Sequence, residues 1–511
     1  MISTALQEAR DTEEMREKSI SEEQRPLFHL SPRVGWMNDP NGFSFYQGQY
    51  HLFYQYYPYN SYWGPMHWGH AVSPDFLRWT YLPAALAPDE KYDKAGVFSG
   101  SAVELPDGRQ LLVYTGVAET YEEKGKKTVR QTQCLAVGDG LDYVKYEGNP
   151  VISSEMIPEG GSLEDFRDPK IRKIEDGTYR MLVANRPADG SGQLLLYRSN
   201  DAFHWEFHKV FAQNFNRFGK MWECPDFFEL DGKSVLLVSP QDMLPEGFEY
   251  HNGNGTLCLI GDYDPCAETF TEETNQAVDY GIDFYAMQTI LSPDGRRIMI
   301  GWMQNWDTIG VREPRDPWFG QMSLPRELRI IDGKLYQYPI RELEKYRRNK
   351  VEYSQALLKG NRALDTVFVK PETVTDGLAL PGISGRCLDM EVVVSCPEGA
   401  KLFNKFTISL AADKEFHTKI SYRPYESIVK IDRKFAGSRR AVIHQRRAQV
   451  QMQDGQIRFR IILDRYSMEV FINGGSKVMT ATIGTELSSD GIFFACDRDA
   501  VISVTKYELV M

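Results

Sequence analysis

The chain has 511 residues, which is too long for one ordinary domain and predicts two. Hydrophobic residues make up 42% of it and charged residues 25%, the balance of a soluble globular protein. The formal net charge of −12 repels phosphate backbones, so we expect no nucleic-acid partner.

The N-terminal segment, residues 1–27, is rich in charged residues and lacks the apolar core of a signal peptide. It predicts an N-terminal arm, either a short amphipathic helix or a frayed segment. No stretch of the sequence has the length and apolarity of a membrane span, so we expect no membrane partner and cytoplasmic residence. The seven cysteines form no Cys-x-x-Cys pair, and their odd number argues against a disulfide framework.

Short apolar runs follow Asp-Gly pairs through the first two thirds of the chain. Each pair predicts a tight turn that feeds a buried strand. The four pairs are Asp107-Gly108, Asp176-Gly177, Asp231-Gly232 and Asp294-Gly295.

A faint internal repeat runs through the same region. Ser73-x-Asp75-x-x-x-Trp79 recurs 126 positions later as Ser199-x-Asp201-x-x-x-Trp205. Asp139 lies about halfway between the two copies, and Asp262 follows 61 residues after Asp201. A unit of about 63 residues fits five times between roughly residues 28 and 345. Repeated all-β units of this kind predict a propeller, with an irregular β-sandwich as the alternative.

The remaining third of the chain predicts a linker and a second domain. Residues 341–356 are highly charged and predict an exposed linker helix. Strand alternation then resumes over residues 357–511. The alternating apolar residues are Ile457, Phe459, Ile461, Leu463, Met468, Val470 and Ile472, and Asn473-Gly474 supplies a hairpin turn. This domain is most simply a β-sandwich.

Three acidic residues stand in short, unusual contexts: Asp39 within Trp36-Met37-Asn38-Asp39-Pro40-Asn41-Gly42, Asp168 within Arg167-Asp168-Pro169, and Glu223 within Trp222-Glu223-Cys224-Pro225. Taken singly, each also fits a plain turn or an outward-facing strand position. Together they match glycosidic bond cleavage with retention, which needs a carboxylate nucleophile and a protonated carboxyl acid.

Each acid has a chemical role in this interpretation. The turn around Asp39 fixes its carboxylate, and hydrogen bonds from Asn38 and nearby amides lower its pKa and keep it ionised as a nucleophile. Asp168, held charged by Arg167, accepts hydrogen bonds from sugar hydroxyls. Apolar walls raise the pKa of Glu223, which then acts as general acid.

The joint pattern resembles glycoside hydrolase family 32, the invertase and fructanase family, over roughly residues 28–511. Besides the three acidic motifs, the matching segments are Phe53-Tyr54-Gln55, Trp63-Gly64, Phe98-Ser99-Gly100-Ser101, Asp283-Phe284-Tyr285-Ala286, Gly301-Trp302-Met303 and Asp464-Arg465-Tyr466-Ser467-Met468-Glu469-Val470-Phe471. The resemblance implies an all-β chain, with a five-bladed β-propeller over residues 28–340 followed by a C-terminal β-sandwich over residues 357–511.

The resemblance also implies residue roles. By position, Asp39 corresponds to the nucleophile, Glu223 to the acid/base and Asp168 to the transition-state stabiliser. The positions that bind fructose in the family correspond to Asn38, Gln55, Trp63, Phe98, Ser99, Arg167, Tyr285 and Trp302. Tyr57 departs from the family pattern, where many relatives carry Asn, and this affects expectations about the rim of the site.

We therefore expect a retaining β-fructofuranosidase that acts on sucrose and short fructo-oligosaccharides. The alternatives are a sucrose-6-phosphate hydrolase, a fructosyltransferase, an inulin-type fructan hydrolase, an inverting arabinan hydrolase and a non-catalytic fructan-binding protein. We expect no metal, because His67-x-x-His70 lacks further ligands, and no cofactor, because nucleotide-binding loops are absent. The oligomeric state stays open, a homo-oligomer included.

Overall fold

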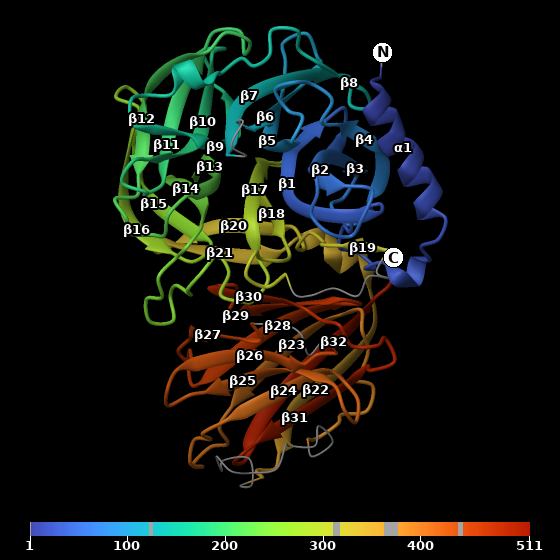
Figure 1. Ribbon diagram of the computed structural model, residues 1–511. Coiled ribbons are helices and arrows are strands. Elements are labelled where there is room, and N and C mark those ends of the chain that lie inside the picture. Colours follow the sequence, from blue (N-terminus) through green and yellow to red (C-terminus); the bar gives the residue numbers. More distant parts are fainter. Residues whose placement is uncertain (1, 122–125, 310–316, 362–376, 438–442) are drawn as a thin grey trace.

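The computed structural model describes residues 2–121, 126–309, 317–361, 377–437 and 443–511. Its regular structure is almost entirely β (Figure 1). The helices within these ranges are α1 (Thr4–Glu17) and three short 3-10 segments, η1 (Glu22–Gln24), η2 (Ser154–Met156) and η3 (Arg341–Tyr346). None of these helices combines the length and apolarity that crossing a bilayer requires.

The strands up to residue 339 form five sheets, and each sheet contains four antiparallel strands that follow one another along the chain. The short strand β19 is the exception. It lies between β18 and β20 in the sequence but joins the edge of the first sheet. In chain order the first sheet holds β1 (Gly35–Tyr46), β2 (Gln49–Tyr57), β3 (His67–Ser73) and β4 (Thr80–Leu86), with β19 (Trp318–Phe319) parallel to β1. The second holds β5 (Gly96–Glu104), β6 (Gln110–Tyr121), β7 (Lys127–Gly138) and β8 (Tyr143–Lys145). The third holds β9 (Gly161–Lys173), β10 (Tyr179–Pro187), β11 (Gln193–Ser199) and β12 (Glu206–Gln213). The fourth holds β13 (Trp222–Leu230), β14 (Lys233–Pro240), β15 (Leu257–Asp264) and β16 (Thr269–Gln276). The fifth holds β17 (Tyr285–Leu291), β18 (Arg297–Trp302), β20 (Arg326–Ile331) and β21 (Lys334–Pro339).

The Asp-Gly turns occupy the same place in four of these sheets. Each joins the first strand of its sheet to the second, and the glycines have φ angles between 78° and 87°, which glycine adopts without steric penalty. The apolar runs that follow lie in β6, β10, β14 and β18 and are buried, as predicted.

The faint repeat marks the turn between the third and fourth strands. The carboxylates of Asp75, Asp139 and Asp201 each accept two backbone N–H groups from two and three residues further on. In the fourth sheet Asp264 makes this turn, accepting from the amides of residues 266 and 267. The assignment of Asp262 to the repeat was therefore wrong by two residues, since Asp262 lies inside β15 and pairs with Lys233.

The first strands of the five sheets contact one another in cyclic order. β1 contacts β5, β5 contacts β9, β9 contacts β13, β13 contacts β17, and β17 returns to β1. Figure 1 shows the sheets arranged around these strands. Side chains at one end of five first strands are thereby brought to a common centre.

Each of the five first strands carries a β-bulge. An extra residue is accommodated at Asn38-Asp39, Ser99, Asp168-Pro169, Cys224-Pro225 and Ala286-Met287. A bulge interrupts the alternation of faces and re-aims side chains, and bulges are common beside active sites. Asp168, Cys224 and Ala286 have φ angles of 64°, 50° and 54°, a left-handed conformation that non-glycine residues adopt only when their surroundings enforce it.

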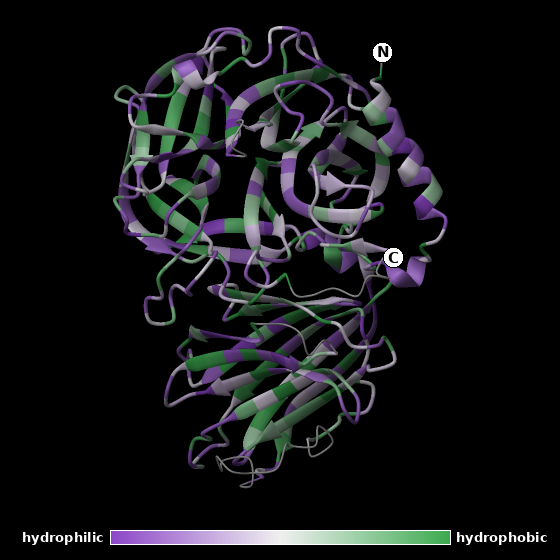
Figure 2. Cartoon of the chain, in the orientation of Figure 1, coloured by the Kyte–Doolittle hydropathy of each residue, from purple (hydrophilic) through white to green (hydrophobic). Residues whose placement is uncertain are grey.

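The chain beyond residue 346 forms two further sheets that enclose a common core. One contains β22 (Arg347–Leu358), β32 (Ala500–Leu509), β23 (Leu388–Ser395), β28 (Gln456–Asp464), β29 (Ser467–Ile472) and β30 (Lys477–Thr482). The other contains β27 (Gln445–Gln449), β26 (Ile428–Phe435), β25 (His417–Arg423), β24 (Phe406–Ala412) and β31 (Gly491–Cys496). The predicted alternating residues lie in β28 and β29, and the Asn473-Gly474 turn leads from β29 into β30. Hydrophobic positions gather along the strands (Figure 2).

The predicted linker helix over residues 341–356 is wrong. Only Arg341–Tyr346 is helical, as the 3-10 segment η3, and Arg347–Leu358 forms β22. Strand β22 pairs along its length with β32, which lies about 150 residues further on. The hydrogen bonds between β22 and β32 therefore decide the structure of this segment, although its charged residues have helical spacing.

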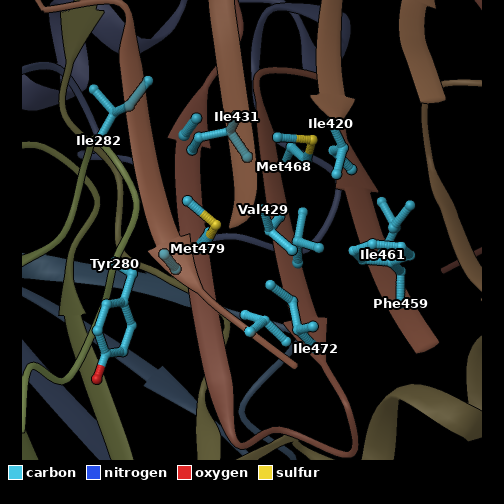
Figure 3. Close-up of a cluster of buried hydrophobic side chains, with 14 of the residues drawn as sticks. Tyr280, Ile282, Ile420, Val429, Ile431, Phe459, Ile461, Met468, Ile472 and Met479 are labelled. Carbon is cyan, nitrogen blue, oxygen red and sulfur yellow. The ribbon is translucent and has the colours of Figure 1, made fainter. Parts of the chain in front are cut away.

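The two parts of the molecule share backbone hydrogen bonds. The segment before β17 runs beside β30, where the amides of Tyr280 and Ile282 donate to the carbonyls of Val478 and Thr480. Figure 3 shows Tyr280 and Ile282 beside Met479, at the edge of the core between the two C-terminal sheets. This pairing fixes the C-terminal sheets against the fifth sheet of the N-terminal part.

A buried charge network crosses the same interface. His29, whose side chain is fully buried, places Nδ1 2.8 Å from the Asp464 carboxylate and Nε2 3.0 Å from that of Glu469. Glu469 also accepts from Arg326, which pairs at 3.0 Å with Asp279. Although burial lowers it, the two carboxylates raise the pKa of His29 overall, to about 9, so the imidazolium is the form that the fold holds.

The network makes the stability of the protein depend on the charge of His29. A histidine with a raised pKa stabilises the fold below its unfolded value of about 6.5, and this contribution is lost as the pH rises through 9. We expect His29→Gln to lower the free energy of unfolding by about 3 kcal/mol more at pH 6 than at pH 9.5. Denaturant unfolding of both proteins at the two pH values measures this difference. The exposed pair His204–Asp201 provides the control, since His204→Gln should change little at either pH. Equal destabilisation by His29→Gln at both pH values would contradict the charged assignment.

Candidate active site

A cavity of about 670 Å³ opens where the first strands of the sheets meet. Its volume lies within the range of about 300–1,000 Å³ that is usual for small-molecule sites. The three acids of the sequence motifs, Asp39, Asp168 and Glu223, all line it, although 184 positions separate the first from the last. The ring of first strands is what brings them together.

Asp39 lies at the bulge of β1 and is held by three donors. Asn38 Nδ2 donates at 3.0 Å and Ser99 Oγ at 2.7 Å, and the thiol of Cys224 lies 3.6 Å from the same carboxylate. Burial and the charge of Glu223 nevertheless raise the pKa of Asp39 above its ordinary value, and the hydrogen bonds offset only part of this rise. The predicted hydrogen bonds exist, but the predicted net lowering of the pKa was wrong because burial outweighs them.

Asp168 occupies the left-handed position in the bulge of β9. Its carboxylate accepts from the backbone N–H of Cys224 at 2.9 Å and lies 3.7 Å from the thiol of the same residue. Burial and the charge of Glu223 raise the pKa of Asp168 to about 7, and Arg167 opposes this rise without cancelling it. Arg167 favours the charged form of Asp168, as expected, but burial and Glu223 outweigh it.

Glu223 has polar neighbours where the sequence suggested apolar walls. Arg167 Nε donates to one oxygen of its carboxylate at 3.0 Å, and the hydroxyl of Tyr285 donates to the other at 2.7 Å. The side chain remains 14% exposed toward the cavity, so a leaving group or a water molecule can reach it. Arg167 is shared with Asp165, to which its Nη1 donates at 2.8 Å.

Ionisation of Asp39 and Asp168 is disfavoured at this site. Like charges at close range oppose one another, and the raised pKa values of Asp39 and Asp168 express that repulsion together with burial. The protons of such a cluster belong to the group, which titrates in coupled steps. Because the pKa of Asp168 is raised to about 7, the cluster titrates near neutral pH, where acid catalysis by a carboxyl group needs a proton.

The residues expected to contact the sugar divide into two groups. Asn38, Gln55, Trp63, Phe98, Ser99 and Arg167 line the cavity. Tyr285 and Trp302 are not among the lining residues, so a sugar contact by either stays a prediction. Tyr285 is 1% exposed and supports Glu223, and Trp302 is fully buried beneath Trp306, with their ring centroids 5.0 Å apart.

Trp306, whose ring lies beside that of Trp302, lines the cavity and was not singled out in the sequence. The remaining lining residues that the sequence did not single out are Val129, Gln131, Glu164, Asp165, Arg186, Gln241, Asp242 and Asn254. Most come from second or third strands and from loops, where no short motif marks them. Asp165 is the exception, because it lies two positions before Arg167 and next to a recognised motif.

Two further residues position the acids. The indole N–H of Trp36 donates to Asn38 Oδ1 at 2.7 Å, which turns the Asn38 amide so that its Nδ2 faces Asp39. Cys224 lies between Asp39 and Asp168 and contacts both carboxylates. Both residues stand inside the acidic motifs, so their presence was visible in the sequence but their roles were not.

Comparison with known proteins identifies the family. Residues 29–339 match the model of the glycosyl hydrolases family 32 N-terminal domain, and residues 342–508 match that of the family 32 C-terminal region. A raffinose invertase of Escherichia coli is 35% identical over 94% of this chain and 93% of its own length. A sucrose-6-phosphate hydrolase of Zymomonas mobilis is 34% identical over 95% and 92%. The structure of a GH32 beta-fructofuranosidase of Bombyx mori superposes with a TM-score of 0.82 at 33% identity, covering 99% of this chain and 98% of the other. The chain therefore belongs to glycosyl hydrolase family 32.

Proposed function

We propose that this glycoside hydrolase cleaves terminal, non-reducing β-D-fructofuranosyl residues from sucrose and short fructo-oligosaccharides, with retention of configuration. The observation that carries the proposal is the meeting of Asp39, Asp168 and Glu223 around one cavity, each in a different hydrogen-bonding environment. The structure of a mutant of the Bombyx mori enzyme in complex with sucrose, at 33% identity to this chain, supports sucrose as substrate.

The scaffold in this proposal is a five-bladed β-propeller followed by a β-sandwich. Four four-stranded sheets and one five-stranded sheet, whose first strands in chain order touch in cyclic order, support five blades. Two sheets around one core beyond residue 346 support the sandwich. We place the propeller at residues 28–340, with residues 1–27 as an arm, and we move the start of the sandwich to residue 347.

The hydrogen bonds assign the first chemical step. The donors Asn38 and Ser99 favour the charged form of Asp39, so this carboxylate attacks the anomeric carbon C2 of the fructosyl unit. Glu223 gives its proton to the glycosidic oxygen as the bond to the leaving group breaks. A covalent fructosyl ester on Asp39 and a free leaving sugar result.

The second step reverses these roles. Glu223, now a carboxylate that accepts hydrogen bonds from Arg167 and Tyr285, removes a proton from a water molecule in the cavity. That water attacks C2, and the ester bond to Asp39 breaks to release fructose. Asp168 accepts hydrogen bonds from the fructosyl hydroxyls, which strengthen as positive charge develops on the ring.

Aromatic side chains shape the cavity for a sugar. Trp63 is 46% exposed at the cavity wall, and its ring meets that of Phe98 edge-on at a centroid distance of 6.1 Å. Trp306 contributes a further ring to the lining. Flat rings of this kind pack against the apolar faces of sugars, and the surrounding amides and carboxylates satisfy the hydroxyls.

Substitution of the two reacting carboxylates tests the mechanism. We expect Asp39→Asn to lower kcat on sucrose by at least about 10⁴-fold, because no covalent intermediate can form. Glu223→Gln should lower kcat by about 10²–10⁴-fold, and by less with a fructoside whose leaving group needs no protonation. Free fructose is assayed, and thermal unfolding verifies the fold. The matched control Asp107→Asn changes an exposed turn carboxylate far from the cavity and should retain full activity. Sucrose cleavage by Asp39→Asn at the control's rate would remove Asp39 from its role.

Asp168→Asn should separate activity from stability. An acid whose folded pKa is raised from 3.8 to about 7 destabilises the fold progressively as the pH rises through that interval. The isosteric amide carries no charge, so we expect it to raise the free energy of unfolding by about 2 kcal/mol at pH 8 and by much less at pH 4, while nearly abolishing sucrose cleavage. Denaturant unfolding of the variant and of the unmodified chain at pH 4 and pH 8 measures this difference. A variant that is less stable than the unmodified chain at pH 8 would count against the raised pKa of Asp168.

The two neighbouring tryptophans should respond differently to truncation. Trp306→Ala removes part of the cavity lining, so we expect KM for sucrose to rise about 10-fold with little loss of stability. Trp302→Ala removes a fully buried ring, so we expect a loss of about 3–5 kcal/mol in unfolding free energy. Steady-state kinetics and denaturant unfolding on both variants provide the comparison. A stable Trp302→Ala protein with a raised KM would instead indicate that Trp302 contacts the sugar.

A further inference from the structure

Relatives of this chain carry names that refer either to raffinose, an uncharged sugar, or to sucrose 6-phosphate, so the charge of the leaving sugar is the open feature of the substrate. We propose that the cavity selects an uncharged leaving group and rejects one that carries a phosphate. This inference rests on the proposed function and specifies its substrate class.

The charged residues of the cavity wall are predominantly acidic. Six carboxylates line it, and only two cations do, both of them arginines; the six are Asp39, Glu164, Asp165, Asp168, Glu223 and Asp242. No lysine belongs to the lining in the part of the chain that the structure describes. The excess of carboxylates is opposite in sign to what a phosphate monoester needs, since that group carries about −1.5 to −2 charges at pH 7.

Both arginines are already engaged by carboxylates. Arg167 pairs with Glu223 at 3.0 Å and with Asp165 at 2.8 Å. Arg186, whose side chain is 44% exposed, pairs with the second oxygen of Asp165 at 2.5 Å. A phosphate that recruited Arg186 would have to break this pair and leave Asp165 beside the new anion.

A helix N-terminus and unpaired arginines are also missing from the described lining. Helix N-termini bind phosphate through free N–H groups, but the one α-helix described, α1, packs against β4 and contributes no residue to the cavity. Arginine clusters bind it through unpaired guanidinium groups, which the two paired arginines do not offer.

Two carboxylates at the cavity wall are free to repel an anion. Glu164 and Asp242 are exposed, and within the described ranges neither side chain has an ion-pair partner. They come from β9 and from the segment after β14. These two carboxylates repel a phosphorylated sugar but not an uncharged one. They therefore favour the uncharged substrate over its phosphorylated counterpart.

Kinetics on sucrose and sucrose 6-phosphate with the full chain test the proposal. We expect kcat/KM for sucrose to exceed that for sucrose 6-phosphate by about 100-fold at low ionic strength. Added salt should raise kcat/KM for the phosphorylated substrate and leave that for sucrose nearly constant, because salt screens repulsion only where the substrate is charged. Equal turnover, or preference for the phosphorylated sugar, overturns the proposal.

A double variant assigns the effect to the two free carboxylates. We expect Glu164→Gln/Asp242→Asn to lower the ratio of the two kcat/KM values about 5- to 10-fold. The matched control Glu175→Gln/Glu398→Gln removes the same number of charges from exposed positions outside the cavity and should leave the ratio unchanged. A ratio that both double variants change equally, or that neither changes, overturns the assignment.

Binding measurements distinguish a failure of this proposal from a failure of the proposed function. Calorimetric titration of the Asp39→Asn protein with each sugar needs no turnover, and we expect sucrose to bind more tightly than sucrose 6-phosphate. If sucrose binds preferentially but the unmodified chain cleaves neither sugar, the proposed function fails and the selectivity stands. If sucrose 6-phosphate binds at least as tightly, the selectivity fails whatever the chain cleaves.

Discussion

Three carboxylates held around one cavity are the constraint on which the rest of the structure depends. Burial and mutual repulsion raise the pKa values of Asp39 and Asp168, so the folded state has to hold the acids together against an unfavourable electrostatic energy. The ring of first strands supplies the necessary rigidity, since each first strand is packed between two others. Strain, desolvation and charge repulsion concentrated in a site are typical of catalytic centres.

The bulges are the local device that aims the acids. A regular strand would alternate side chains between two faces, whereas the extra residue in each first strand lets Asp39, Ser99 and Asp168 face the common centre. The same irregularity turns the Cys224 backbone N–H toward Asp168 and its thiol toward Asp39. One repeated backbone feature therefore positions the reacting groups and part of their hydrogen-bonding environment.

The C-terminal sheets support the ring from outside the site. The acids Asp464 and Glu469 of the last recognised motif contact His29 and Arg326, which belong to the N-terminal part. Backbone hydrogen bonds between the segment before β17 and β30 join the same two parts. Because β17 carries Tyr285, which donates to Glu223, the interface lies next to a strand that positions the acid/base candidate. The C-terminal sheets are thus joined to the N-terminal part through the fifth sheet.

The sequence by itself determined the all-β character, the positions of the Asp-Gly turns and the three acids, because turn residues, strand alternation and short acidic motifs are local signals. The tertiary structure decided what depends on long-range contact. Pairing of β22 with β32 replaced the expected helix, and burial reversed the expected shift in the pKa of Asp39. The tertiary structure also buries Trp302 against Trp306 and places polar side chains beside Glu223. Charge at the cavity wall is likewise a tertiary property, because Glu164, Arg186 and Asp242 lie in different strands and loops and meet only when the sheets close around the centre.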